Sequence, residues 1–224
     1  MAYSQVGIVN LALGRIGKKR ISSMAEGTPQ SIAAAAVWEY VRDEVLEAKD
    51  WKFAKTRYKL SKSSTTPLYR WSYAYPYPQD FIRLATGRKD DPPVFPDTEN
   101  FSSFSWLPGT DMFFLSGYQF PYITEALPDG TLCLLTDYDN SAADLYINYI
   151  KRVTDAQKYL PSFVNALSYR LAGELAIELT EGLKKFDAMM ILYDKALGKA
   201  TEVNQSLDHH DDTGSNSWET AGRG

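Results

Sequence analysis

Near the start of the chain, apolar residues recur every three or four positions, which is the spacing of one face of an α-helix. Ser4 can serve as the N-cap of a first helix that ends near Gly17. A second helix is predicted after Thr28, with Pro29 at its first position, ending at about Trp51. The positions expected to face a core are Val6, Val9, Leu13 and Ile16 in the first helix and Val37, Val41, Val45 and Ala48 in the second.

The helical spacing returns after Pro161, and it predicts a third helix that stops near Gly182 and a fourth that follows directly. Small residues at 172, 173 and 176 would let two helices approach closely. The apolar stripes are Val164, Leu167, Leu171, Leu175 and Leu179 in the third helix, and Phe186, Met190, Tyr193, Leu197, Ala200 and Val203 in the fourth.

Between residues 52 and 153 the period becomes two and aromatic residues accumulate, which favours strands. Because alternate strand residues share a face, five aromatic residues are predicted to project from one side of a strand: Tyr69, Trp71, Tyr73, Tyr75 and Tyr77. Further strands are predicted at Phe81–Thr86, Met112–Leu115, Thr131–Thr136 and Asp144–Arg152. Residues 90–108 carry four prolines and are predicted to form a long exposed loop.

These patterns predict an α+β protein. Two helix pairs, residues 1–51 and 154–207, would form a four-helix body around a large antiparallel β-rich insertion at residues 52–153. The polar residues 208–224 would form an extended C-terminal tail suited to binding a partner.

Composition narrows the choice of function. Apolar residues make up 44% of the chain and charged residues 23%, which is typical of a globular fold. A net charge of -4 argues against strong nucleic-acid binding, because that binding requires a basic surface. No segment approaches the length of a membrane helix and residues 1–5 lack a signal-peptide pattern, so we expect synthesis in a reducing cytoplasm and no membrane partner. The single cysteine, Cys133, lies in an apolar run and is expected to be a buried thiol.

The chain offers little catalytic chemistry. Its two histidines, His209 and His210, both lie in the predicted tail, so a Ser-His-Asp or Cys-His arrangement in the folded body is excluded. The tail sequence His209–Asp212 lacks the ligand spacing of a metal site, and we predict no cofactor, metal or catalytic residue. A pair of carboxylates acting on a glycan stays open, although turn formation is the commoner role of the candidates Asp80, Asp111, Asp129, Asp137 and Asp139.

Two surface features allow two interpretations each. Lys18, Lys19 and Arg20 can contact DNA phosphates, or they can complement the dipole at the end of the first helix. The stripe from Tyr69 to Tyr77 can pack one face of a sheet, or it can form an exposed surface for a partner or a sugar.

Several motifs follow one another over most of the chain. They are Asn10–Gly17 with Ile21, Tyr40–Leu46 leading to Trp51–Ala54, Trp71–Pro76 with Pro78–Leu84, Tyr149–Val153, Ala166–Ala176 and the closing Ser217–Glu219. In this order and spacing they resemble the tail tubular protein A family, the head-to-tail adaptors of short-tailed bacteriophages.

The resemblance implies a non-enzymatic virion protein, made in the bacterial cytoplasm, that forms a ring of twelve subunits around a DNA channel. Its expected partners are the portal protein, the nozzle (tail tubular protein B), the tail fibres and the genomic DNA passing through without sequence-specific binding. The resemblance places portal binding in the tail, at Leu207, Ser217, Trp218 and Arg223. The alternative is a virion protein that binds or hydrolyses cell-surface polysaccharide.

Overall fold

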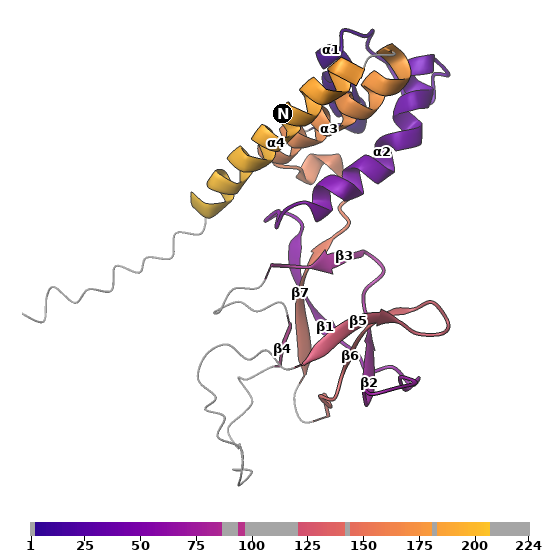
Figure 1. Ribbon diagram of the computed structural model, residues 1–224, viewed down its shortest axis with the longest axis vertical. Helices are drawn as coiled ribbons and strands as arrows, with labels where there is room; N and C mark the ends of the chain where they lie inside the picture. The colour runs from indigo at the N-terminus through magenta and orange to yellow at the C-terminus, as the bar shows by residue number, and fades with distance from the viewer. Residues whose placement is uncertain (1–2, 87–93, 97–120, 142–143, 181–182, 207–224) are drawn as a thin grey trace, which may run out of the picture.

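The computed structural model describes residues 3–86, 94–96, 121–141, 144–180 and 183–206 (Figure 1). Its helices are α1 (Gln5–Arg15), α2 (Pro29–Glu47), α3 (Pro161–Thr180) and α4 (Leu183–Ser206). Its strands are β1 (Lys55–Leu60), β2 (Tyr73–Pro76), β3 (Phe81–Leu84), β4 (Val94–Pro96), β5 (Tyr122–Ala126), β6 (Leu132–Thr136) and β7 (Leu145–Lys151), and a short 3-10 helix spans Ala156–Lys158. The α+β class is confirmed, with one helix pair before the antiparallel strands in the sequence and one pair after them. No helix within these ranges is long and apolar enough to cross a membrane.

The N-terminal helices begin where local sequence signals place them. Ser4 Oγ accepts from the Gly7 amide at 3.1 Å, and Thr28 Oγ1 accepts from the Ser31 amide at 3.3 Å, so both predicted N-caps are confirmed. At its other end α1 closes in a Schellman motif: Gly17 adopts a φ of 74°, and the Lys18 amide donates to the Leu13 carbonyl at 2.9 Å.

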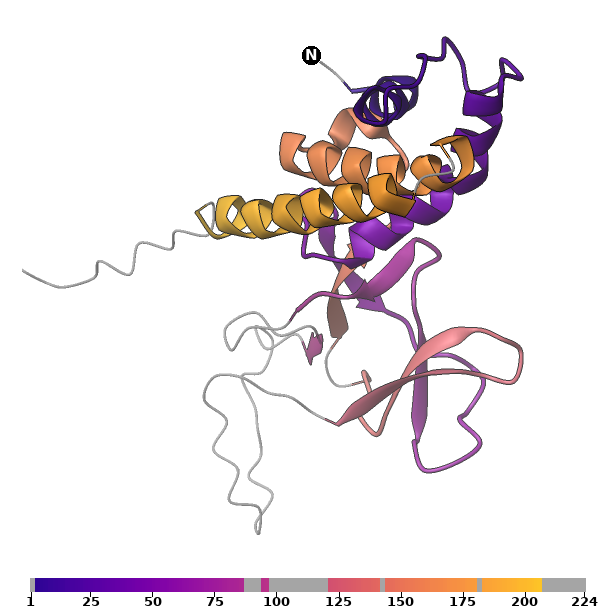
Figure 2. The ribbon, with the colours of Figure 1, turned by 45° about the horizontal axis from the view of Figure 1, so that its top comes forward.

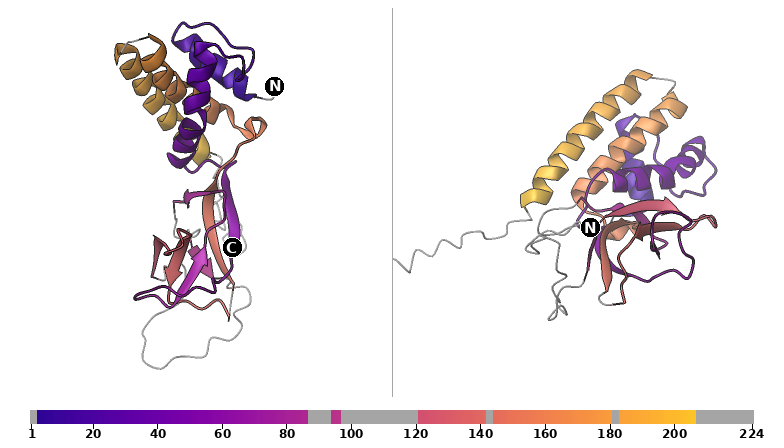
Figure 3. Two further views of the ribbon diagram at one scale, coloured as in Figure 1. Left: turned by 90° about the vertical axis from the view of Figure 1, so that its right-hand side faces the viewer. Right: turned by 60° about the horizontal axis from the view of Figure 1, so that its bottom comes forward.

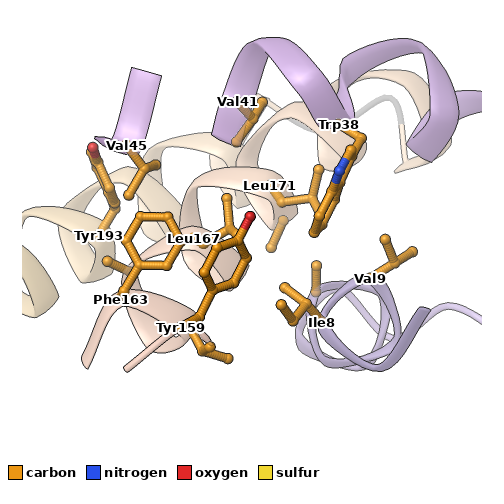
Figure 4. Packing of buried hydrophobic residues seen from close by; sticks show 14 of the residues in the cluster. Ile8, Val9, Trp38, Val41, Val45, Tyr159, Phe163, Leu167, Leu171 and Tyr193 are labelled. Atoms are coloured by element: carbon orange, nitrogen blue, oxygen red, sulfur yellow. The ribbon is translucent and has the colours of Figure 1, made fainter. Parts of the chain in front are cut away.

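In the helical body, α3 contacts each of the other three helices. Figure 2 shows α3 between α1 and α4, with α2 alongside. The close-up in Figure 4 places Phe163, Leu167 and Leu171 of α3 in the middle of the core. Around them lie Ile8 and Val9 of α1, Trp38, Val41 and Val45 of α2, and Tyr193 of α4, all buried. The apolar stripes predicted at helical spacing therefore supply part of this core, whereas Ile8, Trp38 and Phe163 lie outside the predicted stripes and Ala48, predicted to face the core, is exposed.

Within the part of the chain that the structure describes, seven strands form two small antiparallel sheets. In the first sheet, β7 pairs with β1 on one side and with β3 and β4 on the other. In the second sheet, β6 lies between β2 and β5. Apolar residues from both sheets form one shared cluster: Leu60, Val94, Leu145, Ile147 and Tyr149 from the first, and Tyr75 and Leu134 from the second. The opposite face of the second sheet carries a smaller cluster of Trp71, Ala74, Leu127, Cys133 and Leu135.

Polar contacts join the two parts, which lie one above the other in Figure 3. Arg83 of β3 donates from Nε to the Glu47 carbonyl at 2.6 Å, and its Nη2 lies 2.8 Å from Asp50 Oδ1. Arg152, just after β7, pairs with Asp43 of α2 at 2.7 Å. The β region is therefore held against the C-terminal end of α2 by ion pairs as well as by the continuous chain.

The sequence patterns missed three strands. Strands β1 and β5 carry many charged or polar residues and form through pairing with β7 and β6, which leaves little periodic signal in their own sequences. Strand β4 corrects the predicted loop at 90–108, because Val94 pairs with Ile147 of β7 and is buried. The predicted strand at Met112–Leu115 lies outside the described residues.

Candidate functional site

The predicted aromatic stripe does not form one face. Strand β2 covers only Tyr73–Pro76, and Arg70 before it has a φ of 68°, which breaks the alternation. Tyr75 is fully buried between the sheets, where its hydroxyl donates to the Tyr138 carbonyl at 2.8 Å. Trp71 is buried in the cluster on the opposite face, and Tyr73 and Tyr77 pack at the edge of the shared cluster. Of the five, only Tyr69 is largely exposed, so the interpretation as an exposed surface was wrong, whereas Tyr73, Tyr75 and Tyr77 share a packed face as the alternation predicts.

The loop between β1 and β2 instead presents a short apolar tip made of Leu68 and Tyr69, each 86% exposed. The tip adjoins a tight turn, in which the Trp71 amide donates to the Tyr69 carbonyl at 2.8 Å across Arg70. A hydrogen bond between residues two apart, with a positive φ at the middle residue, is a strained form of the γ-turn.

Residues just after the tip fix the loop to the second sheet. The Ser72 amide and hydroxyl both donate to Asp137 Oδ1 at 2.9 Å, and Trp71 is inserted into the cluster with Leu127 and Cys133. The Arg70 guanidinium lies 5.1 Å from the Trp71 ring centroid. The exposed tip is thus a supported feature and not an unattached segment.

An open groove of about 640 Å³ lies on the same β region. Its lining residues are Tyr58, Ser61, Lys62, Pro76, Tyr77, Pro78, Gln79 and Asp80. Behind them, Tyr77 stacks on Phe81 with centroids 4.0 Å apart, and Phe81 stacks on Tyr149. Burial raises the pKa of Tyr77 to about 12, so its hydroxyl, which hydrogen-bonds Thr124 Oγ1 at 2.8 Å, stays neutral at physiological pH.

The carboxylates of this region mainly hold the backbone. Asp129 Oδ1 accepts from the Thr131 amide at 2.9 Å, and this bond lowers the pKa of Asp129. Asp139 Oδ1 accepts from the Ser141 amide and from Lys62, and Asp80 Oδ1 accepts from the Tyr149 hydroxyl at 2.9 Å. Asp111 lies outside the described residues. Turn and loop contacts therefore account for the described aspartates that the sequence singled out.

Metal or thiol chemistry receives no support from the described residues. Within them, no group of three histidine, cysteine, aspartate or glutamate side chains is placed to hold a metal ion. Cys133 is fully buried, as expected, and burial raises the pKa of its thiol. His209 and His210, together with Leu207, Ser217, Trp218 and Arg223 of the predicted portal-binding tail, lie outside the described ranges.

The basic residues after α1 lie at one end of the helical body. Lys19 and Arg20 are exposed, and Lys18 is half-buried. Lys185, from the start of α4, donates to the Ile16 carbonyl at 3.3 Å and so joins this group from the far end of the sequence. No local sequence pattern could have placed Lys185 here. Its ammonium group complements the dipole at the C-terminal end of α1, a role that the sequence suggested for Lys18, Lys19 and Arg20.

The outward faces of two helices carry apolar side chains that no other described element covers. On α2, Ile32 and Tyr40 are 59% and 62% exposed, and Ala36 lies between them at helical spacing. On α4, Leu183 and Ile191 are 72% and 57% exposed. The α2 residues recur at four-residue spacing, which is more typical of a contact surface than scattered exposed residues are, whereas the exposed Asp187 lies between the two apolar residues of α4.

No protein-family model matches the chain, and a search among curated proteins finds no match either.

Proposed function

We propose that this protein is a structural head-to-tail adaptor of a bacteriophage virion, which forms a ring between the portal and the tail nozzle around the DNA channel. One observation carries the proposal: the helical body exposes apolar side chains on two different helices, Ile32, Ala36 and Tyr40 on α2 and Leu183 and Ile191 on α4. When two unlike surfaces of the same chain bind each other, the contact is head-to-tail, and it closes into a ring when the rotation between subunits permits.

The basic group at one end of the body fits the same proposal. Lys18, Lys19, Arg20 and Lys185 bring positive charge to one end of a chain whose net charge is -4. Repeated around a ring, such a group would meet the phosphates of passing DNA without reading its sequence. The resemblance to the tail tubular protein A family implies the partners: the portal for the tail residues 208–224, and the nozzle and the fibres for the opposite end.

Electron microscopy and mass photometry of the purified full chain, alone and mixed with the portal protein of the same virus, test the proposal. We expect rings of twelve subunits, at least in the presence of portal. A double variant, Ile32→Ser with Tyr40→Ser, should keep the melting temperature, because both side chains are exposed, and should lose the rings. The control Glu125→Ser removes an exposed side chain of β5 and should still form rings. A chain that stays monomeric with portal present would refute the proposal.

The tail supplies a separate test. The cores that the structure describes end at Ala200, so a chain lacking residues 208–224 should unfold at the same temperature as the full chain. We expect this truncated chain to lose co-sedimentation with portal. Unchanged co-sedimentation would exclude the tail as the portal-binding segment.

A second candidate function is binding of a cell-surface polysaccharide, and the groove between Tyr58 and Asp80 favours it. Aromatic faces together with amide and carboxylate groups are what sugar rings contact. A glycan array probed with the full chain separates this function from the first. Saturable binding that is lost in Tyr58→Ala would favour it, whereas an empty array together with rings would favour the adaptor.

A further inference from the structure

The tip of the β1–β2 loop exposes two neighbouring apolar side chains to an unusual extent. Single apolar side chains on a protein surface are common and do not by themselves indicate a binding site. Leu68 and Tyr69, however, are adjacent, and both are 86% exposed, more than the other exposed large apolar residues of the described chain. Tyrosine is enriched among the residues that contribute most of the binding energy at the centre of an interface.

The backbone that presents this tip is strained. Arg70 is the one residue other than glycine with a positive φ in the part of the chain that the structure describes. Such a conformation persists only where its surroundings enforce it, and strain of this kind is common at binding sites. Here the enforcing contacts are the burial of Trp71 and the two hydrogen bonds from Ser72 to Asp137. The loop is therefore held in shape before any partner binds, which lowers the entropic cost of docking.

A receiving surface exists on the same β region. The groove offers the apolar walls of Tyr58, Pro76, Tyr77 and Pro78, and its open volume of about 640 Å³ leaves room for two side chains. The tip precedes β2, whereas the groove wall from Pro76 to Asp80 starts at the last residue of β2, so this wall and the tip lie toward opposite ends of the strand. A tip and a groove in these positions can meet on different subunits.

The tip and the groove also carry side chains of opposite charge. Arg70 follows the tip directly and is exposed, and Asp80 contributes a carboxylate to the groove. The groove's own cation, Lys62, lies 3.2 Å from Asp139 and 4.0 Å from the Tyr73 ring centroid, so its charge is engaged within the subunit. An arriving arginine would therefore share the Asp80 carboxylate, whose Oδ1 already accepts from the Tyr149 hydroxyl, beside apolar walls.

From these features we propose that Leu68 and Tyr69 of one subunit insert into the groove formed by Tyr58, Pro76, Tyr77 and Pro78 of a neighbouring copy of the same chain. The inference rests on the proposed ring, because a tip and a groove are unlike surfaces and pair head-to-tail. Two side chains cover far less area than a stable interface needs. The insertion therefore fixes the orientation of neighbouring β regions, while the helical faces supply most of the contact.

A disulfide test addresses the contact directly. Tyr69→Cys places a thiol at the tip, and Gln79→Cys places one on the exposed part of the groove lining. In assembled rings treated with copper phenanthroline as oxidant, we expect the double variant to give a ladder of covalent multimers on a non-reducing gel. The pairing of Tyr69→Cys with Glu125→Cys on β5 should give no ladder, and neither should the single variants or the unaltered chain, whose Cys133 is buried.

The outcomes of this test separate the tip-in-groove contact from the adaptor function. Rings that form without a ladder would overturn the tip-in-groove contact and leave the adaptor function intact. Absence of rings even with portal would remove both proposals. A ladder of equal strength in the Glu125→Cys pairing would indicate random collision and would also overturn the contact.

A second measurement avoids introduced thiols. The double variant Leu68→Ser with Tyr69→Ser should keep the melting temperature of the unaltered chain and weaken ring assembly at least tenfold in subunit concentration. The conservative pair Leu68→Ile with Tyr69→Phe should restore assembly, because it returns the apolar surface. Unchanged assembly in the serine variant would contradict the proposal.

Discussion

Arg170 on α3 donates from its Nε to Oε1 of Glu44 on α2 at 2.9 Å, across 126 positions of sequence. A second carboxylate, that of Glu174 one turn along α3, accepts from Arg170 Nη1. Arg170 is only 7% exposed, so this network lies inside the helical body. It forms an ionic link between the N-terminal and C-terminal helix pairs.

Removal of the arginine should be costly. In Arg170→Met the two carboxylates lose their shared cation, and Oε2 of Glu44 is already buried without a hydrogen-bond partner. Breaking a buried pair costs about 3–5 kcal/mol, and the partial exposure of Glu44 reduces our expectation to about 2 kcal/mol. Urea denaturation followed by circular dichroism measures the loss. The double variant Glu44→Leu with Arg170→Met should recover much of it, and no recovery would contradict an ionic origin.

Glu26 gives the chain a predicted response to acid. Its carboxylate accepts from the Ser22 hydroxyl and amide at 2.6 and 2.7 Å and from the Thr28 hydroxyl at 2.8 Å. The side-chain bond from Ser22 is the largest cause, and these bonds together lower the pKa of Glu26 from 4.5 to about 2. A depressed pKa in the folded state means that the stabilisation is complete above pH 4.5 and is lost as the pH falls toward 2.

We therefore expect the unfolding free energy of the unaltered chain to fall more steeply between pH 4.5 and 2 than that of Glu26→Gln. Carbon-detected NMR titration of the Glu26 carboxyl gives the folded-state pKa directly. A midpoint near that of a free glutamate would show that the Ser22 and Thr28 contacts do not persist in solution.

Tyr75 and Tyr69 allow a matched comparison within the aromatic segment. The buried hydroxyl of Tyr75 donates to the Tyr138 carbonyl and accepts from the Asn140 amide at 3.0 Å. Tyr75→Phe leaves both backbone groups without this partner and should cost about 1–3 kcal/mol. Tyr69→Phe should change stability by less than about 0.5 kcal/mol, because an exposed position is insensitive. Equal effects of the two changes in thermal unfolding would contradict the division of the segment into core and surface.

The helical part of this fold could be predicted because its signals are local. Ser4 and Thr28 cap helices through bonds to residues three positions away, and Pro29 starts a helix wherever it follows such a cap. The apolar spacing then identifies the buried face without knowledge of the partner helix.

The surfaces could not be predicted in the same way. Strict alternation placed Tyr69 and Trp71 on one face, but the positive φ of Arg70 separates them. Arginine is not a residue type that indicates a turn with positive φ, so this turn leaves no sign in the sequence. The groove joins Tyr58 to Asp80 through pairings of β1 and β3 with β7, which is distant in sequence. Lys185 reaches Ile16 across 169 positions. Each of these depends on tertiary contacts that no sequence window contains.

Gly173, in the middle of α3, faces α4. A Cβ atom added there would lie 3.5 Å from Met190 Sδ and 3.6 Å from Phe186 Cδ2, which is ordinary van der Waals contact. Glycine in a helix interior is less favourable than alanine by about 0.8–1.0 kcal/mol. Gly173→Ala should therefore stabilise the chain by about 1 kcal/mol, with a small further gain from contact with α4.

Gly198 on α4 serves as the reference for that change. A Cβ there would meet nothing within 4 Å, so Gly198→Ala should give the gain in helix propensity without the packing contribution. Gly173→Leu should reverse the sign, because its extra carbons would force α3 and α4 apart at a cost of about 1–3 kcal/mol. Urea denaturation midpoints of the three variants measure these differences. If Gly173→Ala destabilises the chain while Gly198→Ala stabilises it, α3 and α4 pack more closely in solution than the structure describes.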